Sequence, residues 1–519
     1  MVTMRGRAAN DDEEVDAVVV GGGLAGCLLA AELASRGKKT MMKQRQQQEE
    51  EEVVVKANGS EQDRQDEQVR QRWRKTRVYE LREDPRRASG KNGGTRLRSI
   101  NLALSMRGLT ALDRIAPDVA ERLRQIGVPM RGRAIHPKTG NVVLQPYGRT
   151  GQALLSVSRA TLNELLLDAA EEAGAELRFG MRCVDVDTKA GRIAFEEAAP
   201  ASVVAASRVK GQPRTSRVRA SLIVGADGAS SRVRGAMQIK KGFNYSQQYI
   251  SHGYKELSIP AGPGGTFLME REALHIWPRD DFMLIALPNE NGSFTLTLFM
   301  AFTSDGDDKE SFESLATDAD VLAFFRREFP DAVPLMPTLL EDFRRNPVSS
   351  LVTIRCDPWV CDDKVAILGD AAHAIVPFYG QGCNCAFEDV RILTELLNAH
   401  GDDDCAGALR AFSESRKKNA DTIADLALYN YEEMRSKTNS PLFVARRNLE
   451  QYLELFLPTS WQFADLHSLV SFTNISYSDV VRKVARQDRI IDACLSCCAC
   501  AIAAMGVAAS WALVARLRR

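Results

Sequence analysis

A glycine pattern near the N-terminus constrains the fold more than any other feature of the sequence. Residues 15–20 (VDAVVV) are typical of a short buried β-strand, and Gly21–Gly26 (GGGLAG) follows without a break. The apolar residues from there to Gly37 recur at helical spacing, so the pattern predicts a strand, a tight turn and a helix. Gly21, Gly23 and Gly26 would let the backbone approach a pyrophosphate, whose charge the helix N-terminus would meet. We therefore expect an α/β domain that binds a dinucleotide.

An acidic residue that binds a ribose is expected roughly 20 residues after such a turn. Glu80 ends the next convincing strand, Arg77–Glu80, but it lies 59 residues after Gly21. A polar, low-complexity segment, residues 43–74, accounts for most of the excess, because its composition cannot bury enough apolar surface to join a core. We interpret this segment as an insert, either a solvated charge-paired helix or a disordered stretch, and Glu80 as the ribose ligand. The alternative is a surface Glu at a strand end.

Length and composition exclude several classes of protein. A chain of 519 residues predicts two to four domains, and 45% hydrophobic and 26% charged residues are near the globular average. The 68 basic residues balance the 68 acidic ones, so no nucleic-acid partner is expected. The 6 His lack metal-ligand spacing, so no metal site is predicted. The 11 Cys are too unevenly placed for a disulfide scaffold. The N-terminus shows no apolar stretch typical of a signal peptide.

Two later glycine–aspartate turns add to the first pattern. Residues 224–228 (VGADG) look like a strand running into a turn, and residues 367–373 (ILGDAAH) look like a strand, a turn and a helix start. Glycine permits close backbone approach in both, and Asp227 and Asp370 can accept a hydrogen bond from a polyol. Either turn alone could be a plain helix N-cap. In this order the three motifs resemble those of the single-component flavoprotein hydroxylases, which use FAD, NAD(P)H and O2 in one chain.

Longer strings resemble the kynurenine 3-monooxygenase family within that group. The likeness runs from about residue 15 to residue 475, interrupted by the 43–74 segment and by a weak loop or hairpin insert at 197–218. The strings that carry it are RSINLALSMRG (98–108), FNYSQQYISHGY (243–254), LHIWPRDDFMLIALPN (274–289), GDAAHAIVPFYGQGCNCAFED (369–389) and LYNYEEMR (428–435).

The resemblance implies an α/β fold. A Rossmann-like FAD-binding domain would contain an inserted antiparallel β-sheet substrate domain, followed by a C-terminal helical region and a C-terminal membrane helix. The predicted boundaries are 12–128, 149–235 and 350–395 for the FAD-binding domain, 129–148 and 236–349 for the substrate domain, 396–489 for the helical region and 490–519 for the membrane anchor.

The resemblance also assigns cofactor-binding residues. FAD would be bound by the three motifs and by residues between and shortly after them, and NADPH would be the co-substrate. The positions implied are Gly21, Gly23, Ala25, Gly26, Tyr79, Glu80, Leu81, Arg82, Ala103, Arg159, Cys183, Asp227, Asp370, Cys383 and Asn384.

The substrate residues implied by the resemblance lie in four parts of the chain. Arg133 and Tyr147 would hold the substrate carboxylate, because a guanidinium binds a carboxylate in bidentate fashion and a phenol adds a further hydrogen bond. Asn430 would reach the same ligand, and Phe378 would shape the space beside the flavin. His467 stands where the family has a substrate-contacting Tyr. From the residues alone, Arg133 is equally consistent with a surface cation.

The implied reaction is the hydroxylation of L-kynurenine to 3-hydroxy-L-kynurenine with NADPH and O2, through a flavin C4a-hydroperoxide. Because the cofactor carries the chemistry, no acid–base residue of the protein is assigned. The protein would orient the ring and exclude water. Two alternatives remain open at this point. One is a related flavin hydroxylase acting on a lipid or isoprenoid, and the other is a non-enzymatic scaffold that keeps the flavoprotein fold.

The C-terminus carries a separate signal. Residues 493–515 are 23 residues without a charge, with basic residues on both sides, which is long enough to cross about 30 Å of hydrocarbon as a helix. The alternative is a buried core helix. The family resemblance implies an anchor in the mitochondrial outer membrane with the catalytic domain facing the cytosol. The cysteines in this stretch are interpreted as small apolar filler and given no chemistry.

Overall fold

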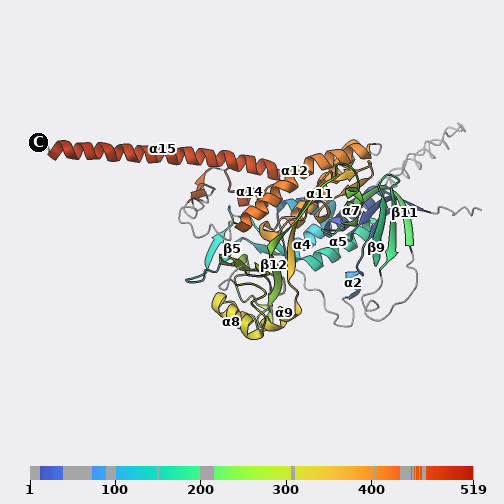
Figure 1. Ribbon diagram of the computed structural model, residues 1–519, viewed down its shortest axis with the longest axis horizontal. Helices are drawn as coiled ribbons and strands as arrows, with labels where there is room; N and C mark the ends of the chain where they lie inside the picture. Colours follow the sequence, from blue (N-terminus) through green and yellow to red (C-terminus); the bar gives the residue numbers. More distant parts are fainter. Residues whose placement is uncertain are drawn as a thin grey trace, which may run out of the picture. The chain divides into compact units, whose positions relative to one another are not determined.

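The computed structural model divides the chain into two compact units (Figure 1). Unit 1 consists of residues 1–147 and 153–439, and unit 2 consists of residues 148–152 and 440–519. The residues described are 12–38, 73–88, 101–148, 151–198, 215–304, 310–401, 404–432, 446, 449–450, 452–454, 456–458 and 463–517. The predicted insert 43–74 therefore lies, but for its last two residues, outside the described residues.

The first sheet of unit 1 is built around a parallel core. β1 (Glu13–Val20) lies between β2 (Thr76–Tyr79) and β11 (Thr215–Gly225) and is parallel to both. The parallel array continues to β8 (Glu176–Arg178) beyond β2 and to β18 (Val365–Ile367) beyond β11. Residues 17–20 of β1 are all buried, which is typical of a parallel strand covered on both faces. The helix at residues 24–38 follows β1, as the spacing predicts.

Three described strands outside the parallel array join this sheet through antiparallel pairs. β10 (Arg192–Glu197) pairs with both β9 (Met181–Asp187) and β11, and the short β17 (Val360–Cys361) pairs with β18. The pairing of β10 with β11 corresponds to the hairpin alternative for the segment 197–218, of which residues 199–214 lie outside the described residues. α5 (Arg159–Ala173) is a helix that begins directly after β7 (Leu154–Ser158).

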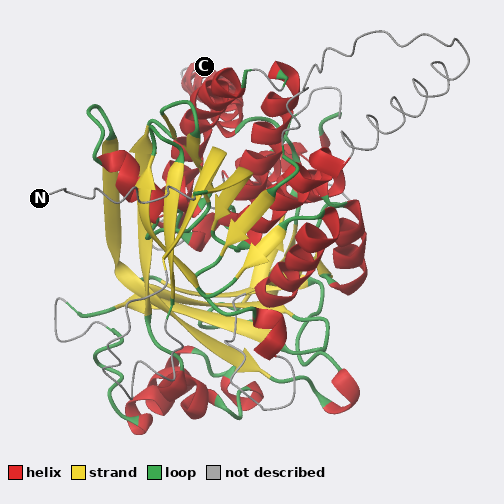
Figure 2. Ribbon diagram, turned by 90° about the vertical axis from the view of Figure 1, so that its right-hand side faces the viewer, coloured by secondary structure: helices red, strands yellow, loops and turns green. Residues whose placement is uncertain are grey.

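The second sheet of unit 1 has seven strands and is mainly antiparallel. Its order is β16-β12-β15-β14-β13-β5-β6, and only β13 and β5 run parallel. Figure 2 shows that its strands run in clearly different directions from those of the first sheet. The strands are β5 (Gly132–Ile135), β6 (Val143–Pro146), β12 (Asn244–Ile259), β13 (Ala273–Arg279), β14 (Phe282–Pro288), β15 (Phe294–Ala301) and β16 (Ser349–Asp357).

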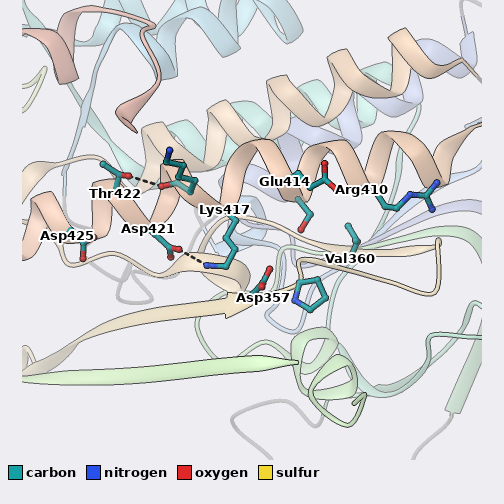
Figure 3. A pocket seen from close by; sticks show the side chains of 11 residues that line it. Asp357, Val360, Arg410, Glu414, Lys417, Asp421, Thr422 and Asp425 are labelled. Carbon is teal, nitrogen blue, oxygen red and sulfur yellow. Dashed lines mark hydrogen bonds and ion pairs between the residues drawn. The ribbon is translucent and has the colours of Figure 1, made fainter. Parts of the chain in front are cut away.

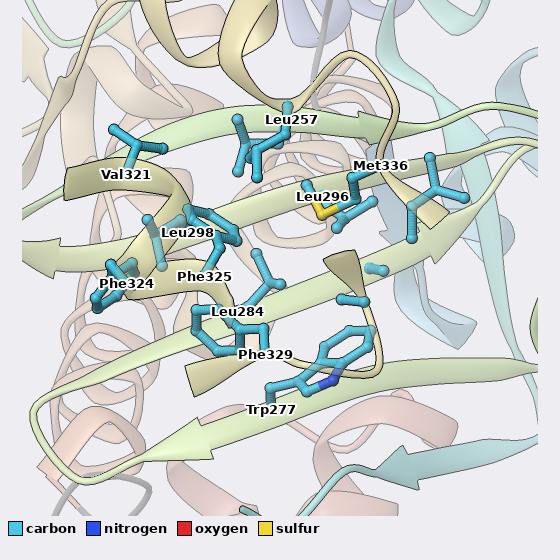
Figure 4. Packing of buried hydrophobic residues seen from close by; sticks show 14 of the residues in the cluster. Leu257, Trp277, Leu284, Leu296, Leu298, Val321, Phe324, Phe325, Phe329 and Met336 are labelled. Atoms are coloured by element: carbon cyan, nitrogen blue, oxygen red, sulfur yellow. The ribbon is translucent and has the colours of Figure 1, made fainter. Parts of the chain in front are cut away.

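The two faces of the second sheet have different partners. One face packs on α8 (Asp318–Glu328) and α9 (Leu339–Arg345), and Figure 4 shows Phe324 and Phe325 of α8 above Leu284 and Leu298 of the sheet. The other face carries Met283 and Phe299 and packs on residues 375–379 and on α12 (Cys405–Glu432). Alternating side chains of each strand thus fill two separate cores.

A small third sheet and several helices complete unit 1. β3 (Asn101–Leu104) and β4 (Val128–Met130) pair antiparallel with β7 (Leu154–Ser158). The helices on and around the sheets are α2 (Pro85–Ala88), α3 (Met106–Ile115), α4 (Pro117–Ile126), α7 (Arg232–Gln238), α10 (Asp370–His373) and α11 (Gly382–His400). Three short 3₁₀ turns are η1 (Pro263–Gly265), η2 (Val333–Leu335) and η3 (Pro377–Tyr379).

Unit 2 is helical where it is described. Asp465 caps α14 (Leu466–Phe472) by accepting the backbone N–H of Ser468 at 2.6 Å. α15 (Tyr477–Leu517) is the long C-terminal helix, and its Asp488 and Asp492 form ion pairs with Arg446 at 3.0 and 2.6 Å. In the described part of the chain, no helix meets the length and hydropathy that a membrane span requires. The predicted C-terminal membrane helix is therefore not supported by the structure.

A candidate dinucleotide and substrate site

The motifs identified in the sequence meet at one edge of the first sheet. Val20, the last residue of β1, is in register with Tyr79 of β2 and Gly225 of β11, and Gly225 is in register with Ile367 of β18. Because these strands are parallel, the four segments that follow them leave the sheet on the same side. Ligands of open α/β sheets bind beyond the carboxyl ends of the strands. The structure thus brings the glycine turn, Glu80 and both glycine–aspartate turns to a single place.

The glycine turn after β1 is closely packed at two of its positions and open at a third. Gly21 has φ +106°, and its N–H donates to the carbonyl oxygen of Tyr79 at 2.8 Å. A Cβ atom on Gly26 would lie 2.0 Å from the carbonyl oxygen of Gly21, so only glycine fits there. A Cβ atom on Gly23, in contrast, would meet no protein atom within 4 Å. Gly23 therefore borders open space, where a pyrophosphate could approach the backbone.

Glu80 is buried against this turn. One carboxylate oxygen accepts the N–H of Gly22 at 2.7 Å, and the other accepts the N–H and the Nε of Arg82 at 3.0 and 2.7 Å. The Arg82 side chain is itself mostly exposed, and Leu81 is exposed too. Glu80 is 7% exposed, which excludes the alternative of a surface Glu at a strand end.

Tyr79 has a structural role in its side chain. Its ring stacks on Phe195 of β10 with 3.6 Å between centroids, and its hydroxyl accepts a hydrogen bond from Arg77 at 3.2 Å. The residue is 3% exposed. The backbone of Tyr79 is therefore the part of this residue that faces the glycine turn, through the bond to Gly21.

Asp227 serves the start of α7 and keeps one atom free. Its Oδ2 accepts the N–H groups of Arg232 and Val233 at 2.7 and 3.3 Å. Its Oδ1 is buried and has no hydrogen-bond partner among the described residues. Burial raises the pKa of the Asp227 carboxyl above its usual range. The predicted Cys183 lies close enough for the Asp227 charge to act on its thiol.

The second glycine–aspartate turn lies beside the first motif. Gly369 has φ +57°, and a Cβ atom added to Gly369 would lie 3.8 Å from the Cβ atom of Ala25. Asp370 follows as the first residue of α10 and is exposed. Asp370 and Arg159 both act electrostatically on Cys383 of α11, whose pKa burial raises to about 12. The structure thus groups four of the predicted cofactor residues around one turn.

Asn384 holds the neighbouring loop rather than pointing out of it. Its Oδ1 accepts the N–H of Ser105 at 2.9 Å, and its Nδ2 donates to the carbonyl oxygens of Ala103 and Gly380, both at 2.9 Å. Asn384 is fully buried. Its side chain therefore fixes the loop 380–384 against β3, and the predicted Ala103 takes part through its backbone.

These residues fit a bound FAD. The open space beside Gly23 suits a pyrophosphate at the N-terminus of the helix 24–38. Gly382, the first residue of α11, also borders open space, and the exposed Asp370 and the unpartnered Oδ1 of Asp227 supply acceptors for hydroxyl groups. All of these groups lie on the carboxyl side of the sheet, where the dinucleotide is expected.

Arg133 and Tyr147 lie together in the second sheet. Arg133 is on β5, opposite Gln145 of β6, and Tyr147 follows β6 directly. The guanidinium carbon of Arg133 lies 5.7 Å from the centroid of the Tyr147 ring. The Nε of Arg133 is buried, and in the part of the chain that the structure describes it has no hydrogen-bond partner. Burial raises the pKa of the Tyr147 phenol, and the nearby guanidinium offsets part of this shift.

Phe378 and Asn430 also lie together. Asn430, near the end of α12, donates from Nδ2 to the carbonyl oxygen of Phe378 at 2.7 Å. The Phe378 ring stacks on Tyr431 with 4.4 Å between centroids and lies 5.2 Å from Phe299 of β15. An aromatic wall of Phe299, Phe378 and Tyr431 thus lines the sheet face opposite α8 and α9. Tyr431 was not among the residues predicted, because nothing in its sequence pattern separates it from an ordinary helix residue.

His467 lies in unit 2, in the first turn of α14. Its ring contacts Phe472 with 6.0 Å between centroids. Its predicted contact with the substrate stays a prediction.

A cavity of 520 Å³ lies on another part of unit 1. Its lining comes from α12 and from the turn between β16 and β17 (Figure 3). Lys417 is paired with Asp421 at 2.5 Å, and Asp357, Glu414 and Asp425 bring further negative charge. These are not the residues of the predicted site, and the mixed charges favour no ion of either sign.

Comparison with known proteins agrees with this geometry. A family model described as an FAD binding domain matches residues 14–427. The tetrameric form of 2-methyl-3-hydroxypyridine-5-carboxylic acid oxygenase superimposes with a TM-score of 0.57 at 20% identity, over 83% of this chain and 95% of that chain. Pseudomonas aeruginosa PqsL in complex with 2-aminobenzoylacetate gives the same TM-score at 17% identity, over 82% and 97% of the two chains. These likenesses show the fold.

Curated relatives are more similar in sequence. Kynurenine 3-monooxygenase of Christiangramia forsetii is 41% identical over 82% of this chain and 89% of its own. The enzyme of the same name from Myxococcus xanthus is 43% identical over 80% and 84% of the two chains, and that from Anopheles gambiae is 41% identical over 80% of both. The predicted family, the FAD-binding α/β fold and the flavin cofactor are confirmed. The chain belongs to the kynurenine 3-monooxygenase family of FAD-dependent monooxygenases.

Proposed function

We propose that this protein hydroxylates L-kynurenine to 3-hydroxy-L-kynurenine, using FAD, NADPH and O2. The observation that carries the proposal is the convergence of the glycine turn, Glu80 and both glycine–aspartate turns at one sheet edge, in a chain more than 40% identical to enzymes of that name. FAD, reduced by NADPH, supplies the activated oxygen when it is bound. The chain's own residues bind and orient the substrate and exclude water.

Arg133 holds the carboxylate of the substrate. Its buried Nε has no partner within the described chain, and a buried N–H of a charged group is costly unless a ligand or water satisfies it. An amino-acid carboxylate supplies that partner in bidentate geometry. Tyr147 lies beside the guanidinium and adds a hydroxyl to the same anion site.

The aromatic wall orients the ring of the substrate. Phe378 is fixed through its carbonyl by Asn430 and through its ring by Tyr431, so its position is set by two residues of α12. A flat aromatic substrate packs well against such rings in offset or edge-to-face geometry. The apolar surroundings keep water away from the reacting centre. In this arrangement Asn430 acts mainly on the position of Phe378.

No acid or base from the protein is assigned to the reaction. The amino group of the substrate ring already activates the carbon ortho to it, so the protein has to supply orientation rather than a proton-transfer group.

Arg133 has a matched control two residues away. Arg131 is exposed and paired with Glu272 at 2.7 Å, so Arg131→Ala removes a positive charge from the same segment without touching the site. We expect Arg133→Ala to keep FAD and to raise the KM for kynurenine by 30-fold or more, since loss of a charge-assisted pair costs about 2–5 kcal/mol. Arg131→Ala should leave KM within about twofold. Equal KM values for the two variants would remove Arg133 from the site.

Substrate scope separates the proposal from its alternatives. A hydroxylase of a lipid or isoprenoid would not need the Arg133–Tyr147 pair, and it would oxidise NADPH without stimulation by kynurenine. A non-enzymatic scaffold would show no stimulation by either compound. NADPH oxidation with kynurenine, with an isoprenoid quinol precursor and with neither compound distinguishes the three cases. Only stimulation by kynurenine, with the hydroxylated product found by mass spectrometry, supports the proposal.

Attachment to the mitochondrial outer membrane is a separate proposal, supported by sequence and family resemblance alone. It rests on the uncharged residues 493–515 and on the basic residues around them. A chain ending at Asp488 should hydroxylate kynurenine and remain in the supernatant after centrifugation. Membrane fractionation of both forms from eukaryotic cells gives the comparison. A full-length chain found in the supernatant without detergent would refute the anchor.

A further inference from the structure

Five ionisable side chains form a buried cluster beneath the second glycine–aspartate turn. They come from four helices: α3, and the three helices α10, α11 and α12, which follow one another later in the chain. Each of the five is 2% exposed or less. The members of this buried cluster are Arg107, His373, Glu388, Asp389 and Arg416.

Asp389 is the centre of the cluster and also reaches the turn. Its Oδ2 accepts the backbone N–H of Gly369 at 3.1 Å and lies 2.5 Å from Nε2 of His373. Its Oδ1 accepts Nε of Arg416 at 2.8 Å. Because Nε2 of His373 faces a carboxylate, that nitrogen carries the proton and donates it. Asp389 thus joins three donors, one of which is the backbone of the turn itself.

The other members hold Asp389 in place. Arg416 also donates to Glu388 at 2.7 Å, and Glu388 accepts Arg107 of α3 at 2.8 Å. The ring of His373 stacks on Trp359 with 5.0 Å between centroids. The carboxylate of Asp389 therefore has little freedom to move, and the N–H of Gly369 is held with it.

Fold stability alone is a weak reason for such a cluster. Desolvation of buried charges can exceed their mutual attraction, and apolar residues of similar volume often serve the fold as well. Buried charges do, however, define geometry, because each hydrogen bond has one direction. Here the geometry defined is that of Gly369, which has φ +57° and directly precedes Asp370.

A metal site is a competing interpretation, since His373, Cys385 and Asp389 lie within metal-binding reach of one another. The guanidinium of Arg416 argues against it. This group bonds Asp389 and lies 3.4 Å from Sγ of Cys385, where its positive charge would repel a metal cation. Asp389 and His373 are moreover bonded directly to each other, as an ion pair or hydrogen bond rather than as two ligands.

We propose that Asp389, held by His373 and Arg416, is a positioning residue for FAD: it fixes the Gly369 N–H and thereby the direction in which Asp370 meets the cofactor. The inference rests on the FAD site of the proposed function and deepens it. Because both carboxylate oxygens of Asp389 are already bonded to groups of the protein, its effect passes through the turn. Loss of the carboxylate lets the turn rotate, and Asp370 then meets the flavin moiety less often in its binding geometry.

The test measures FAD affinity in apo protein, by quenching of flavin fluorescence, alongside urea unfolding of the apo form. In Asp389→Asn an NH2 group replaces one carboxylate oxygen and faces hydrogen-bond donors instead of acceptors. The FAD Kd should therefore rise at least tenfold. His373→Ala should also raise it, whereas His373→Gln keeps an N–H donor and should recover most of the affinity. Asp342→Asn is the matched control. Asp342 is a fully buried carboxylate that accepts Ser258 at 2.6 Å and Arg345 at 2.8 Å on α9, in the second sheet's core.

The outcomes separate positioning from general stability. Asp342→Asn should lower the free energy of unfolding while leaving the FAD Kd within about twofold. Folded Asp389→Asn with wild-type FAD affinity overturns the proposal. If Asp389→Asn does not fold, the two His373 variants test the proposal. Equal FAD Kd values for His373→Ala and His373→Gln would then overturn it. A wild-type protein that binds FAD but does not hydroxylate kynurenine would refute the proposed substrate and leave this inference intact.

Discussion

Replacing single glycines in the turn after β1 separates cofactor contact from fold. A methyl group on Gly23 points into space that holds no protein atom within 4 Å, whereas a methyl group on Gly26 lies 2.0 Å from the carbonyl oxygen of Gly21. Gly23→Ala should therefore leave the apo fold intact and obstruct only a ligand. Gly26→Ala should disturb the turn whether or not FAD is present.

The magnitudes follow from these contacts. The N-cap position of Gly23 tolerates alanine at a cost of up to about 1 kcal/mol. A cofactor phosphate pushed away by a methyl group loses one charge-assisted hydrogen bond to the backbone, worth about 1.5–3 kcal/mol, which corresponds to a 10- to 150-fold rise in Kd. For Gly26, a contact this far inside van der Waals distance requires the turn to open, and we expect a loss of more than about 2 kcal/mol in the apo form.

Both quantities can be measured on the same samples. Flavin is removed from each variant, FAD is titrated back with fluorescence detection, and urea unfolding of the apo protein is followed by circular dichroism. The reasoning predicts a weakened FAD affinity in Gly23→Ala at near wild-type apo stability. Wild-type FAD affinity in Gly23→Ala would show that no phosphate approaches that part of the backbone.

Three further predictions concern other parts of unit 1 and the cysteines. Burial lowers the pKa of His275 to about 4, against 6.5 for the free side chain. His275 therefore leaves the free energy of unfolding unchanged above about pH 6.5 and lowers it by up to about 3 kcal/mol towards pH 4. Urea unfolding at both pH values should show that His275→Asn removes this loss. Phe378→Ala should raise, by severalfold, the share of NADPH oxidation that yields hydrogen peroxide, at unchanged FAD content, because water would enter beside the flavin. A peroxide assay checks this, with Phe343→Ala on the opposite face of the second sheet as the control. Iodoacetamide at neutral pH should label exposed cysteines before buried ones, whose raised pKa keeps the thiol protonated, and peptide mass mapping would show this order. The exposed set is Cys494, Cys497 and Cys500, and the buried set with a pKa of about 12 is Cys27, Cys183 and Cys356.

The dinucleotide site could be predicted from the sequence because the constraints on its residues are local. Gly26 has to be glycine on account of an atom five residues away, and Gly369 has to adopt a positive φ within a single turn. Strand ends that carry such motifs meet at one edge in any parallel sheet, so their convergence follows from the pattern. Glu80 was predicted because it ends the next strand and because the 43–74 insert accounts for its long spacing. The structure buries it and bonds it to Gly22, and its contact with the ribose stays a prediction.

Contacts between residues of different helices and strands could not be predicted in the same way. Asp389 and Arg416 look like ordinary charged residues of helices, and their pairing depends on how α11 and α12 pack. Asn384 was assigned to the cofactor, but its side chain is used by three backbone groups of a neighbouring loop and strand. The stacking of Phe195 on Tyr79 likewise brings together residues from separate strands. Such contacts are set by tertiary packing, which a local pattern does not record.

The C-terminal stretch shows the opposite problem. A run of 23 uncharged residues is a clear signal in sequence, yet its alanine-rich composition is only moderately hydrophobic. The described part of the chain contains no helix that meets the requirements of a membrane span. Uncharged length and sufficient hydropathy are separate conditions, and the sequence pattern established only the first.

The central claim is that this chain inserts oxygen from O2 into the ring of kynurenine. The most direct measurement is a single reaction of the flavin-loaded full-length protein with NADPH and L-kynurenine under isotopically labelled O2, followed by mass spectrometry of the product. The account predicts 3-hydroxykynurenine that carries one labelled oxygen atom, formed in proportion to the NADPH consumed. Unlabelled product, or NADPH consumption that yields only hydrogen peroxide, would contradict it.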